Sequence, residues 1–503
     1  MAELQDGERR FLAAVSKLAY CNPFLPERTD HERAALGKDY VPREIVWSAS
    51  VADPESSSPN VARLHARLEP LIEKIHARAG NLSGADLSVY EDCVHHLIYQ
   101  RYYPQFVAAR GNWSFYRAFA ADWERYITRE GMHFESVAEA PHFFACFRQV
   151  QSAFHHIFDN IIGNSMPAAR LRAAVWQSVF THDLRRYRRI LYSRMQDFPT
   201  LITGPSGTGK ELVARAIAGS RYVAFDAVRT RFADSLHEAF VAVNLAALSP
   251  ALIESELFGH RRGSFTGAVG DRKGWLESCP PTGSVFLDEL GEMELSIQVK
   301  LLRVIETRRF SAVGDTALRE FSGKLIAATN RNLQAEIETG RFREDLYYRL
   351  CADQIQTPSL REQMEDSPDV LHELILFMVR RTVGEEAERC LDEVEIWIHD
   401  HLPAHYGWPG NYRELEQCVR NVIIRGSYKP LADRKTASEG TFLARFRNGE
   451  MTVDELVSHY AAQVYRKTGS YEETARKLGI DRRTVKSRVG KFLTAAGSSQ
   501  TDG

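Results

Sequence analysis

The spacing of apolar residues predicts a helical N-terminal region. Over residues 1–160 the periodic stretches have a helical period, so that apolar side chains recur every three or four positions. One face of a predicted helix carries Leu64, Leu68, Leu71 and Ile75, at i, i+4, i+7 and i+11. This pattern predicts a mostly α-helical domain over residues 1–160.

A different pattern begins near residue 161, where short β-rich runs each precede a loop and a helical stretch. Short apolar runs that end in polar residues or glycine, separated by helices, are typical of a parallel sheet wrapped by helices. Four runs fit this description: Thr200–Thr203, Phe240–Val243, Ser284–Leu287 and Lys324–Ala328. We therefore predict an α/β core over residues 161–365.

The rest of the chain is predicted to be helical on both sides of one linker. Residues 366–426 have a wholly helical pattern, apart from the loop His405–Asn411. Residues 427–450 are polar and weakly periodic, which predicts a linker. A last helical module is expected over residues 451–503.

Composition and charge limit the class of protein. The chain has 503 residues, of which 44% are apolar and 26% charged, and these values are typical of a soluble multidomain protein. Its N-terminus lacks the apolar core of a secretory signal, and no run approaches the roughly 18 apolar residues that span a bilayer. We expect a cytoplasmic protein with no membrane partner and with mostly buried, reduced cysteines. The net charge of −2 still allows a locally basic nucleic-acid module.

A phosphate-binding loop follows the first predicted strand. Residues 204–210 read GPSGTGK, between an apolar strand and the start of a helix. Glycines allow backbone N–H groups to converge on phosphate oxygens, and the lysine reaches the β- and γ-phosphates. The predicted nucleotide-binding residues are Gly204, Pro205, Ser206, Gly207, Thr208, Gly209, Lys210 and Glu211. Glu211 stands where the generic motif has a hydroxyl residue that binds Mg²⁺.

The predicted strand at 285–289 ends in two carboxylates, Asp288 and Glu289. Asp288 is expected to hold Mg²⁺, and Glu289 to polarise the water that attacks the γ-phosphate of ATP. Taken alone, an Asp-Glu pair at a strand end is structural about as often as it is functional. Together with the phosphate loop, the pair predicts an ATPase site whose cofactors are ATP and Mg²⁺.

The order of these motifs resembles that of a known family. Between the phosphate loop and the Asp-Glu strand lie Glu256–His260, which read ELFGH, and then GSFTGA at 263–268. This order, with GPSGTGKE, is similar to the central domain of bacterial enhancer-binding proteins, the AAA+ activators of sigma-54 RNA polymerase. The resemblance implies an AAA+ ATPase core with a helical lid at 366–426, and Glu after the lysine is a form seen in this family. Residues 182–196 look like an addition to the family's pattern.

The resemblance implies roles for five further residues. Asn244 is expected to couple the catalytic glutamate to the nucleotide state, and Asn330 to sense the γ-phosphate. Arg343 and Arg349 are expected to act in trans on the nucleotide of a neighbouring subunit, which implies a hexameric ring. Arg413 is expected to reach from the lid back to the nucleotide. Taken alone, an arginine in a charged helix is usually a solvated surface residue.

The same resemblance implies that residues 263–268 form a surface loop that contacts sigma-54. The expected contact residues are Gly263, Ser264, Phe265, Thr266, Gly267 and Ala268. Ser264 departs from the alanine that the family usually has, and we expect a weakened or retuned contact. The alternative is a buried turn with Phe265 in the core, which the charged neighbours Arg261 and Asp271 disfavour. A second phosphate loop is disfavoured because no lysine follows the glycines.

The C-terminal module has the pattern of a helix-turn-helix. Ala475 and Leu478 are expected to pack the first helix, Gly479 to form the turn and Asp481 to cap the second helix. The predicted DNA-binding residues are Arg482, Arg483, Thr484, Lys486 and Arg488. The module resembles the Fis-type domain of the same family, which implies a dimer on double-stranded DNA upstream of a promoter. A small helix pair with a solvated basic face is the alternative.

The input signal of the N-terminal domain is not readable from its sequence. The resemblance implies a regulatory or sensory role, but the alternating β/α pattern of a phosphorylated receiver is absent. His95–His96 and His155–His156 do not suit a shared metal, because adjacent histidines on a helix point about 100° apart. We interpret them as ordinary core or surface residues, and the aromatic residues at 113–126 as core.

Three functions fit these patterns. The leading hypothesis is an ATP-dependent transcription activator that binds upstream DNA, assembles a ring and remodels sigma-54 RNA polymerase. The alternative is an AAA+ DNA-binding regulator that acts independently of sigma-54 through another partner. A plain DNA-binding repressor over an inactive nucleotide fold is disfavoured by the intact Lys210, Asp288 and Glu289.

Overall fold

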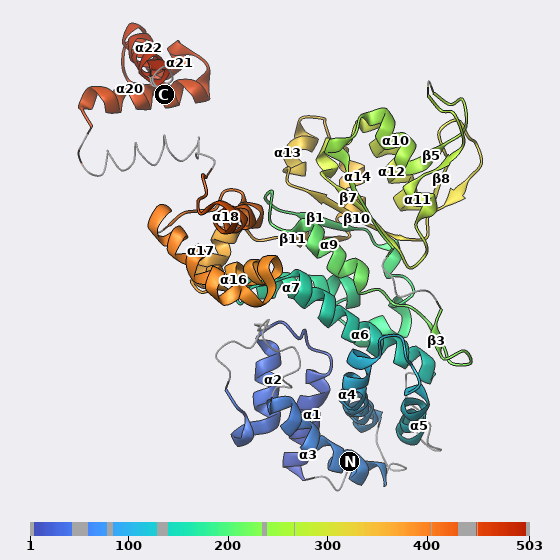
Figure 1. The fold of residues 1–503 in the computed structure, drawn as a ribbon. Coiled ribbons are helices and arrows are strands. Elements are labelled where there is room, and N and C mark those ends of the chain that lie inside the picture. The colour runs from blue at the N-terminus through green and yellow to red at the C-terminus, as the bar shows by residue number, and fades with distance from the viewer. Residues whose placement is uncertain are drawn as a thin grey trace. The chain divides into compact units, whose positions relative to one another are not determined.

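The computed structural model describes residues 5–42, 59–77, 84–127, 139–233, 239–265, 267–403, 405–430, 449 and 451–498 (Figure 1). Its contacts divide the chain into two compact units, Met1–Tyr428 and Lys429–Gly503. The division falls inside the predicted linker 427–450, most of which lies outside the described residues, as does Thr266. Among the described helices, none is long and apolar enough to cross a membrane.

The N-terminal region is helical, which confirms the predicted class. Its described α-helices are α1 (Asp6–Leu18), α2 (Glu27–Leu36), α3 (Pro59–His76), α4 (Gly84–Ala108), α5 (Tyr116–Ile127) and α6 (Ala140–Asn160). The buried face of α3 consists of Leu64, Leu68, Ile72 and Ile75. Leu71 lies at the edge of this face and is partly buried, because an apolar face is wider than a single row of residues.

An aromatic cluster around Phe144 forms the centre of the N-terminal core. The ring centroid of Phe144 lies 4.6 to 5.3 Å from those of Phe106, Phe115, Tyr116, Phe119 and Phe225. Phe225 belongs to β2 (Phe225–Asp226), which pairs with β3 (Arg231–Phe232) in a hairpin that follows the phosphate-loop helix. A hairpin of the α/β core therefore completes the N-terminal core, across the predicted boundary at residue 160.

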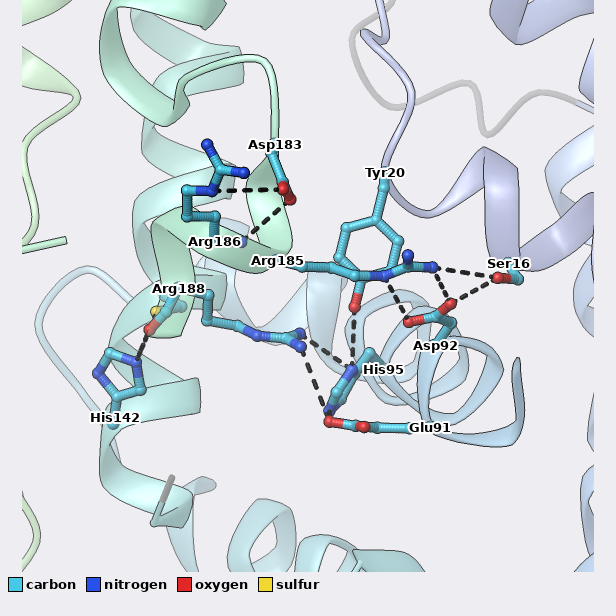
Figure 2. A network of polar contacts seen from close by, with 11 residues as sticks. Ser16, Tyr20, Glu91, Asp92, His95, His142, Asp183, Arg185, Arg186 and Arg188 are labelled. Carbon is cyan, nitrogen blue, oxygen red and sulfur yellow. Dashed lines mark hydrogen bonds and ion pairs between the residues drawn. The ribbon is translucent and has the colours of Figure 1, made fainter. Parts of the chain in front are cut away.

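The added sequence before the first strand of the sheet forms short helical turns. After α7 (Met166–Phe180) come α8 (Leu184–Arg186), a π-helical turn at Tyr187–Leu191 and a 3₁₀ turn at Met195–Asp197. The side chains of Arg185 and Arg188 reach from these turns to α4, where they enter a network of polar contacts (Figure 2).

This polar network is largely buried and ties the turns to the N-terminal helices. Arg185 pairs with Asp92, which also accepts a hydrogen bond from Ser16 Oγ (2.5 Å). The guanidinium of Arg188 lies 2.9 Å from His95 Nδ1. Burial, together with the two arginines, holds the pKa of His95 well below its usual value. The imidazole is therefore neutral and accepts the hydrogen bond from Arg188.

Five parallel strands form the sheet of the α/β core, in the order β11, β1, β10, β7, β4. Figure 1 labels the first four of these strands. Four of them confirm the predicted runs: β1 (Thr200–Thr203), β4 (Phe240–Asn244), β7 (Ser284–Asp288) and β10 (Lys324–Thr329). The edge strand β11 (Asp353–Gln356) was not predicted, because Ile355 is its single buried residue in a polar stretch. Since the strands run parallel, their carboxyl ends meet at one edge of the sheet.

Helices cover both faces of the sheet. After β1 they are α9 (Lys210–Gly219), α10 (Pro250–Phe258), α11 (Trp275–Ser278), α12 (Leu295–Thr307), α13 (Leu333–Glu338) and α14 (Glu344–Leu350). Alternate strand residues belong to different clusters: Val285 and Leu287 pack with α10 and α12, whereas Phe286 packs with α7 and α9. Two short strand pairs extend from this core, β5 (Gly259–His260) with β6 (Arg272–Lys273), and β8 (Arg309–Phe310) with β9 (Arg319–Glu320).

The predicted helical region after the sheet is confirmed. It contains α15 (Leu360–Asp366), α16 (Val370–Val383), α17 (Ala387–His401) and α18 (Asn411–Arg425), which share a hydrophobic cluster that includes Trp408. The second unit, taken by itself, contains α20 (Val453–Thr468), α21 (Tyr471–Leu478) and α22 (Arg482–Ser498). Its small core includes Ala461, Val485 and Val489.

Replacing Phe225 by alanine is expected to destabilise the N-terminal region, although the residue follows the phosphate-loop helix. The change leaves a cavity beside Phe144, and the loss of a buried phenyl ring costs about 3–5 kcal/mol. Chemical denaturation followed by tryptophan fluorescence should show an earlier transition. Val228→Ala, on the same hairpin and 96% exposed, is the control and should change stability by less than about 0.5 kcal/mol. An unchanged transition for Phe225→Ala would contradict the shared core.

Candidate nucleotide site

The phosphate loop lies between β1 and α9, at the carboxyl edge of the sheet. Gly207 has a φ of 78°, and a Cβ at this position would approach the carbonyl oxygen of Gly410 to 2.2 Å. A Cβ on Gly204 would approach Thr357 Oγ1, beyond β11, to 2.1 Å. Both glycines are therefore required by the close packing of the loop against the lid and the neighbouring strand end.

Lys210 is buried in the first turn of α9, and its ammonium group folds back over the loop. Its Nζ donates to the carbonyl oxygens of Gly204 (3.1 Å) and Pro205 (3.0 Å). Burial lowers the pKa of Lys210, and the nearby carboxylates of Glu289 and Asp288 oppose that shift. The structure thus brings the loop lysine and the two strand-end carboxylates together, as the sequence predicts.

Asp288 and Glu289 differ in backbone and environment although they are adjacent. Burial raises the pKa of Asp288, while a hydrogen bond from the backbone N–H of Glu289 (3.0 Å) and the charge of Lys210 act against that shift. Glu289 has a φ of 56°, which is uncommon for a residue with a side chain. Such backbone strain occurs most often at functional sites. It falls here on the residue predicted to polarise the attacking water.

Two asparagines flank the carboxylates in different ways. Asn330, after β10, donates from Nδ2 to Glu289 Oε1 (3.2 Å). Asn244 pairs with Asp288 in the register of β4 and β7, but its side-chain oxygen accepts from the backbone N–H of Ala246 (2.9 Å). Asn330 therefore has the contact with the glutamate that the resemblance implied for Asn244. Asn244 instead holds the turn that leads into α10.

The lid contacts the phosphate loop through Asn411, for which the sequence predicted no role. Its Nδ2 donates to the carbonyl oxygen of Ser206 (2.9 Å), and its Oδ1 accepts from the backbone N–H of Leu360 (2.9 Å). The backbone N–H of Tyr412 donates to the carbonyl oxygen of Gly207 (3.1 Å). Asn411 has a φ of 52° at the start of α18, a conformation that asparagine tolerates. The sequence signal for this role is an asparagine that follows a glycine and begins a helix.

Two more side chains converge on the loop. Arg413 lies close enough to lower the pKa of both Lys210 and Asp288, although larger effects dominate each shift. The role of Arg413 toward the nucleotide stays a prediction. Thr357, which was not predicted, shares a hydrogen bond with Thr208 through their hydroxyl groups (2.6 Å). The nucleotide-facing loop is therefore held by the strand end beyond β11 and by the lid.

Arg343 and Arg349 lie on the surface at the two ends of α14. Arg343 pairs with Asp345 (2.6 Å), and Arg349 pairs with Glu306 (3.1 Å). Within the described part of the chain, neither arginine bonds to a residue of the nucleotide site. Gln298 is buried and accepts a hydrogen bond from the backbone N–H of Arg343 (2.9 Å). Gln298 therefore fixes the backbone that carries an exposed arginine.

The predicted sigma-54 loop projects between β5 and β6. The backbone N–H of Gly263 donates to the carbonyl oxygen of Ala268 (2.9 Å), which closes the tip. Phe265 is 42% exposed, and its ring packs edge-on against His260 with centroids 5.0 Å apart. Phe265 is therefore a surface residue and not part of the core. Thr266, its predicted partner, lies outside the described residues.

Ser264 faces a neighbouring loop and not the tip. A Cβ on Gly314, between β8 and β9, would lie 2.7 Å from the Cβ of Ser264. The hydroxyl of Ser264 is buried and has no hydrogen-bond partner among the described residues. Arg261 connects the same two loops through Asp315 (2.9 Å). An unsatisfied buried hydroxyl is unfavourable, so the serine gains no contact within the described residues that an alanine would lack.

In the second unit, α21 and α22 form the predicted helix-turn-helix. Gly479 has a φ of 66° between them, and Asp481 Oδ1 accepts from the backbone N–H of Arg483 (2.6 Å). The exposed predicted DNA-binding residues are Arg482, Arg483, Thr484 and Lys486. Arg488 is partly buried and pairs with Asp454 of α20. It therefore joins two helices of the module, as does Arg482, which pairs with Glu472 of α21 (2.8 Å).

Comparison with known proteins identifies the central domain. The sigma-54 interaction domain family matches residues 178–356. The chain therefore contains a domain of this family over these residues. Transcriptional regulatory protein ZraR from Klebsiella oxytoca is 38% identical over 303 residues, which make up 59% of this chain and 64% of ZraR. The Nif-specific regulatory protein from Azotobacter vinelandii is 43% identical over 224 residues, or 44% of this chain and 39% of that protein.

The family match includes the phosphate loop, both carboxylates and the loop at 263–268. Arg413 and the helix-turn-helix lie outside it. The chain spans just under two thirds of the length of ZraR. A crystal structure of NtrX from Brucella abortus in complex with ADP is 23% identical to this chain, with a TM-score of 0.39, and the alignment covers 74% of this chain and 80% of that one.

Replacing Asn411 by alanine is expected to weaken nucleotide binding from the lid side. The change leaves the N–H of Leu360 and the carbonyl of Ser206 without this partner, which costs about 1–3 kcal/mol. We expect the affinity for a fluorescent ADP analogue to fall about tenfold. Asn421→Ala, on the same helix with a hydrogen bond only to Gln417, is the matched control. Equal affinities for both variants would show that the Asn411 contact does not support the site.

Proposed function

We propose that this protein is an ATP-hydrolysing transcription activator that remodels sigma-54 RNA polymerase. The observation that carries the proposal is the meeting of Lys210, Asp288 and Glu289 at one edge of a sheet that lies within a sigma-54 interaction domain. A plain DNA-binding repressor has no use for this arrangement.

ATP and Mg²⁺ are the proposed cofactors, and the side chains present fit them. The backbone N–H groups of residues 204–210 and the ammonium of Lys210 would bind the β- and γ-phosphates. Asp288 offers a carboxylate oxygen, which is the ligand type that Mg²⁺ prefers. Mg²⁺ would supply charge neutralisation at the phosphates. Glu211, in place of a hydroxyl residue, leaves Asp288 as the main protein ligand.

Glu289 is proposed as the base that accepts a proton from the attacking water. Its Oε1 receives a hydrogen bond from Asn330, which fixes the direction of the carboxylate. Asn330 directly follows the neighbouring strand β10 and is proposed to sense the γ-phosphate. A bound γ-phosphate would compete with Glu289 for the hydrogen bond from the amide of Asn330. The side chain of Asn330 would therefore connect the nucleotide state to the base.

The output of hydrolysis is proposed to reach sigma-54 through Phe265. Asn244 ends β4, and the turn Leu245–Ala247 leads into α10 and then into the loop with Phe265. Asn244 is the register partner of Asp288. A displacement at the carboxylates would therefore pass through the paired strands β7 and β4 and then along the chain from Asn244 to the exposed ring.

Assembly and DNA binding complete the proposal. Arg343 and Arg349 would exchange their present carboxylate partners for the nucleotide of a neighbouring subunit, which makes hydrolysis depend on a hexameric ring. The exposed basic residues of α22 would bind double-stranded DNA upstream of the promoter, with the module acting as a dimer. We place this activity in the cytoplasm.

Glu289→Gln should abolish ATP hydrolysis and preserve nucleotide binding. The amide keeps the size of the side chain but cannot accept a proton, and the loss of a general base lowers kcat by about 10²- to 10⁴-fold. Phosphate release and nucleotide affinity are measured on the same preparation. Glu292→Gln, whose carboxylate pairs with Arg331, is the control and should hydrolyse ATP at nearly the parent rate. Hydrolysis that survives Glu289→Gln would assign the base elsewhere.

Phe265→Ala should separate hydrolysis from activation. The ring is exposed and lies away from the nucleotide site, so the ATPase rate should persist while open-complex formation by sigma-54 polymerase is lost. The control is Val269→Ala, a neighbouring residue that is 86% exposed. If open complexes form normally with Phe265→Ala, the alternative regulator that works through another partner is favoured.

A further inference from the structure

A second pocket lies at the opposite, amino edge of the sheet from the phosphate loop. Its free volume is about 30 Å³, and three parts of the chain line it. α6 contributes Gln149, the helical turns before β1 contribute Tyr187 and Tyr192, and the α/β core contributes Arg221, Tyr222 and Lys324. The described lining residues include two cations and no carboxylate.

Lys324 is the first residue of β10 and is 3% exposed. Its Nζ bonds only to backbone carbonyl oxygens, those of Phe198 (3.0 Å) and Met195 (3.4 Å). Within the described part of the chain it has no carboxylate at ion-pair distance. Burial lowers the pKa of Lys324 to about 8, with Asp353 acting in the opposite direction. A buried ammonium without a counter-ion is unfavourable.

Arg221 has the same kind of environment. Its guanidinium donates to the carbonyl oxygens of Gly283 and Pro281 and to the side-chain oxygen of Gln196 (3.2 Å), all of them neutral acceptors. Burial lowers its pKa to about 10. Among the described residues it too has no carboxylate at ion-pair distance. Arg221 also lies close enough to Lys324 to lower the pKa of that lysine.

Neighbouring acids do not remove this excess of positive charge. Asp353 accepts hydrogen bonds from Ser178 Oγ (2.5 Å) and Thr200 Oγ1 (2.6 Å) at the start of the sheet. Asp197 lies 3.9 Å from a third cation, Arg308, which itself acts to lower the pKa of Lys324. The pocket therefore has one buried and one half-buried cation with a third cation nearby, and the two neighbouring carboxylates, Asp353 and Asp197, are bonded elsewhere.

We propose that this pocket binds a small anionic molecule through a carboxylate or phosphate group held by Lys324 and Arg221. An anion supplies the counter-charge that both cations lack, and a charge-assisted hydrogen bond is roughly twice as strong as a neutral one. The side chains of Tyr187, Tyr192 and Tyr222 line the rest of the pocket, which has room only for a small anion.

The pocket lies where the N-terminal region meets the phosphate-loop helix. Gln149 Nε2 of α6 donates to the carbonyl oxygen of Ser220 (2.9 Å), and Gln149 Oε1 accepts from Tyr187 (2.8 Å). Ser220 follows the last residue of α9, whose first residue is Lys210. One helix thus carries the phosphate loop at its start and the anion pocket at its end.

The test uses the full chain with Lys210→Ala, so that anions cannot be detected through the phosphate loop. Inorganic phosphate and acetate are titrated separately at constant ionic strength, with chloride as the reference anion. Calorimetry and thermal unfolding measure binding and stabilisation. We expect saturable binding of at least one of the two anions and a rise in Tm, because a ligand that binds only the folded state stabilises it. The readout includes neither hydrolysis nor activation, so it is independent of the proposed function.

Variants then locate the bound anion. Adding Lys324→Met should weaken its binding at least about tenfold, because a hydrogen bond to a charged group is lost from a buried site. Arg221→Gln is a second variant with the same expectation, and Lys273→Met, at an exposed lysine paired with Glu277, should change nothing. The proposal is overturned if neither anion binds saturably, or if binding is equal in the Lys324→Met and Lys273→Met chains.

Discussion

The parallel register of the central sheet is the constraint on which the rest of the structure depends. It brings the carboxyl ends of β1, β7 and β10 to one edge, so that Lys210, Asp288 and Asn330 meet although they are distant in sequence. Side chains of a strand alternate between the two faces of a sheet. A slip of one residue in β7 would therefore place Asp288 where the buried Leu287 now lies. Both the apolar packing of the core and the position of the carboxylates would be lost. The same alternation that fills the core thus positions the carboxylates.

The N-terminal region is connected to this edge through α9. Ser152 Oγ of α6 donates to the carbonyl oxygen of Gly219 (3.0 Å) at the end of that helix. The chain then enters the β2–β3 hairpin, which places Phe225 in the aromatic core of the N-terminal region. Packed cores deform little without losing contacts. A rearrangement of α6 must therefore displace the end of the phosphate-loop helix or separate the hairpin from its core.

Local patterns in the sequence predicted most of the fold and the parts of the site that depend on short motifs. Four strands, the phosphate loop and the strand-end carboxylates can be read this way because each depends on residues that are adjacent in the chain. β11 could not, since an edge strand with one buried residue has no apolar pattern. Asn411 and Ser206 are 205 residues apart, and their contact depends on how the lid packs. Arg488 fits a basic helix face by spacing alone, and its pairing with Asp454 follows from the packing of a third helix.

The two edges of the sheet differ in the balance of their charges, and they therefore suit different ligands. At the carboxyl edge, Lys210 lies near Asp288 and Glu289, so the site offers groups of both signs, as a phosphate with its metal ion requires. At the amino edge, Lys324 and Arg221 donate to neutral acceptors, so a bound anion would supply the negative charge that these two cations lack. A second nucleotide with Mg²⁺ would bring a cation to a place that has no carboxylate among its described lining residues. The amino-edge pocket therefore fits an anion without a metal, and α9 connects it to the phosphate loop.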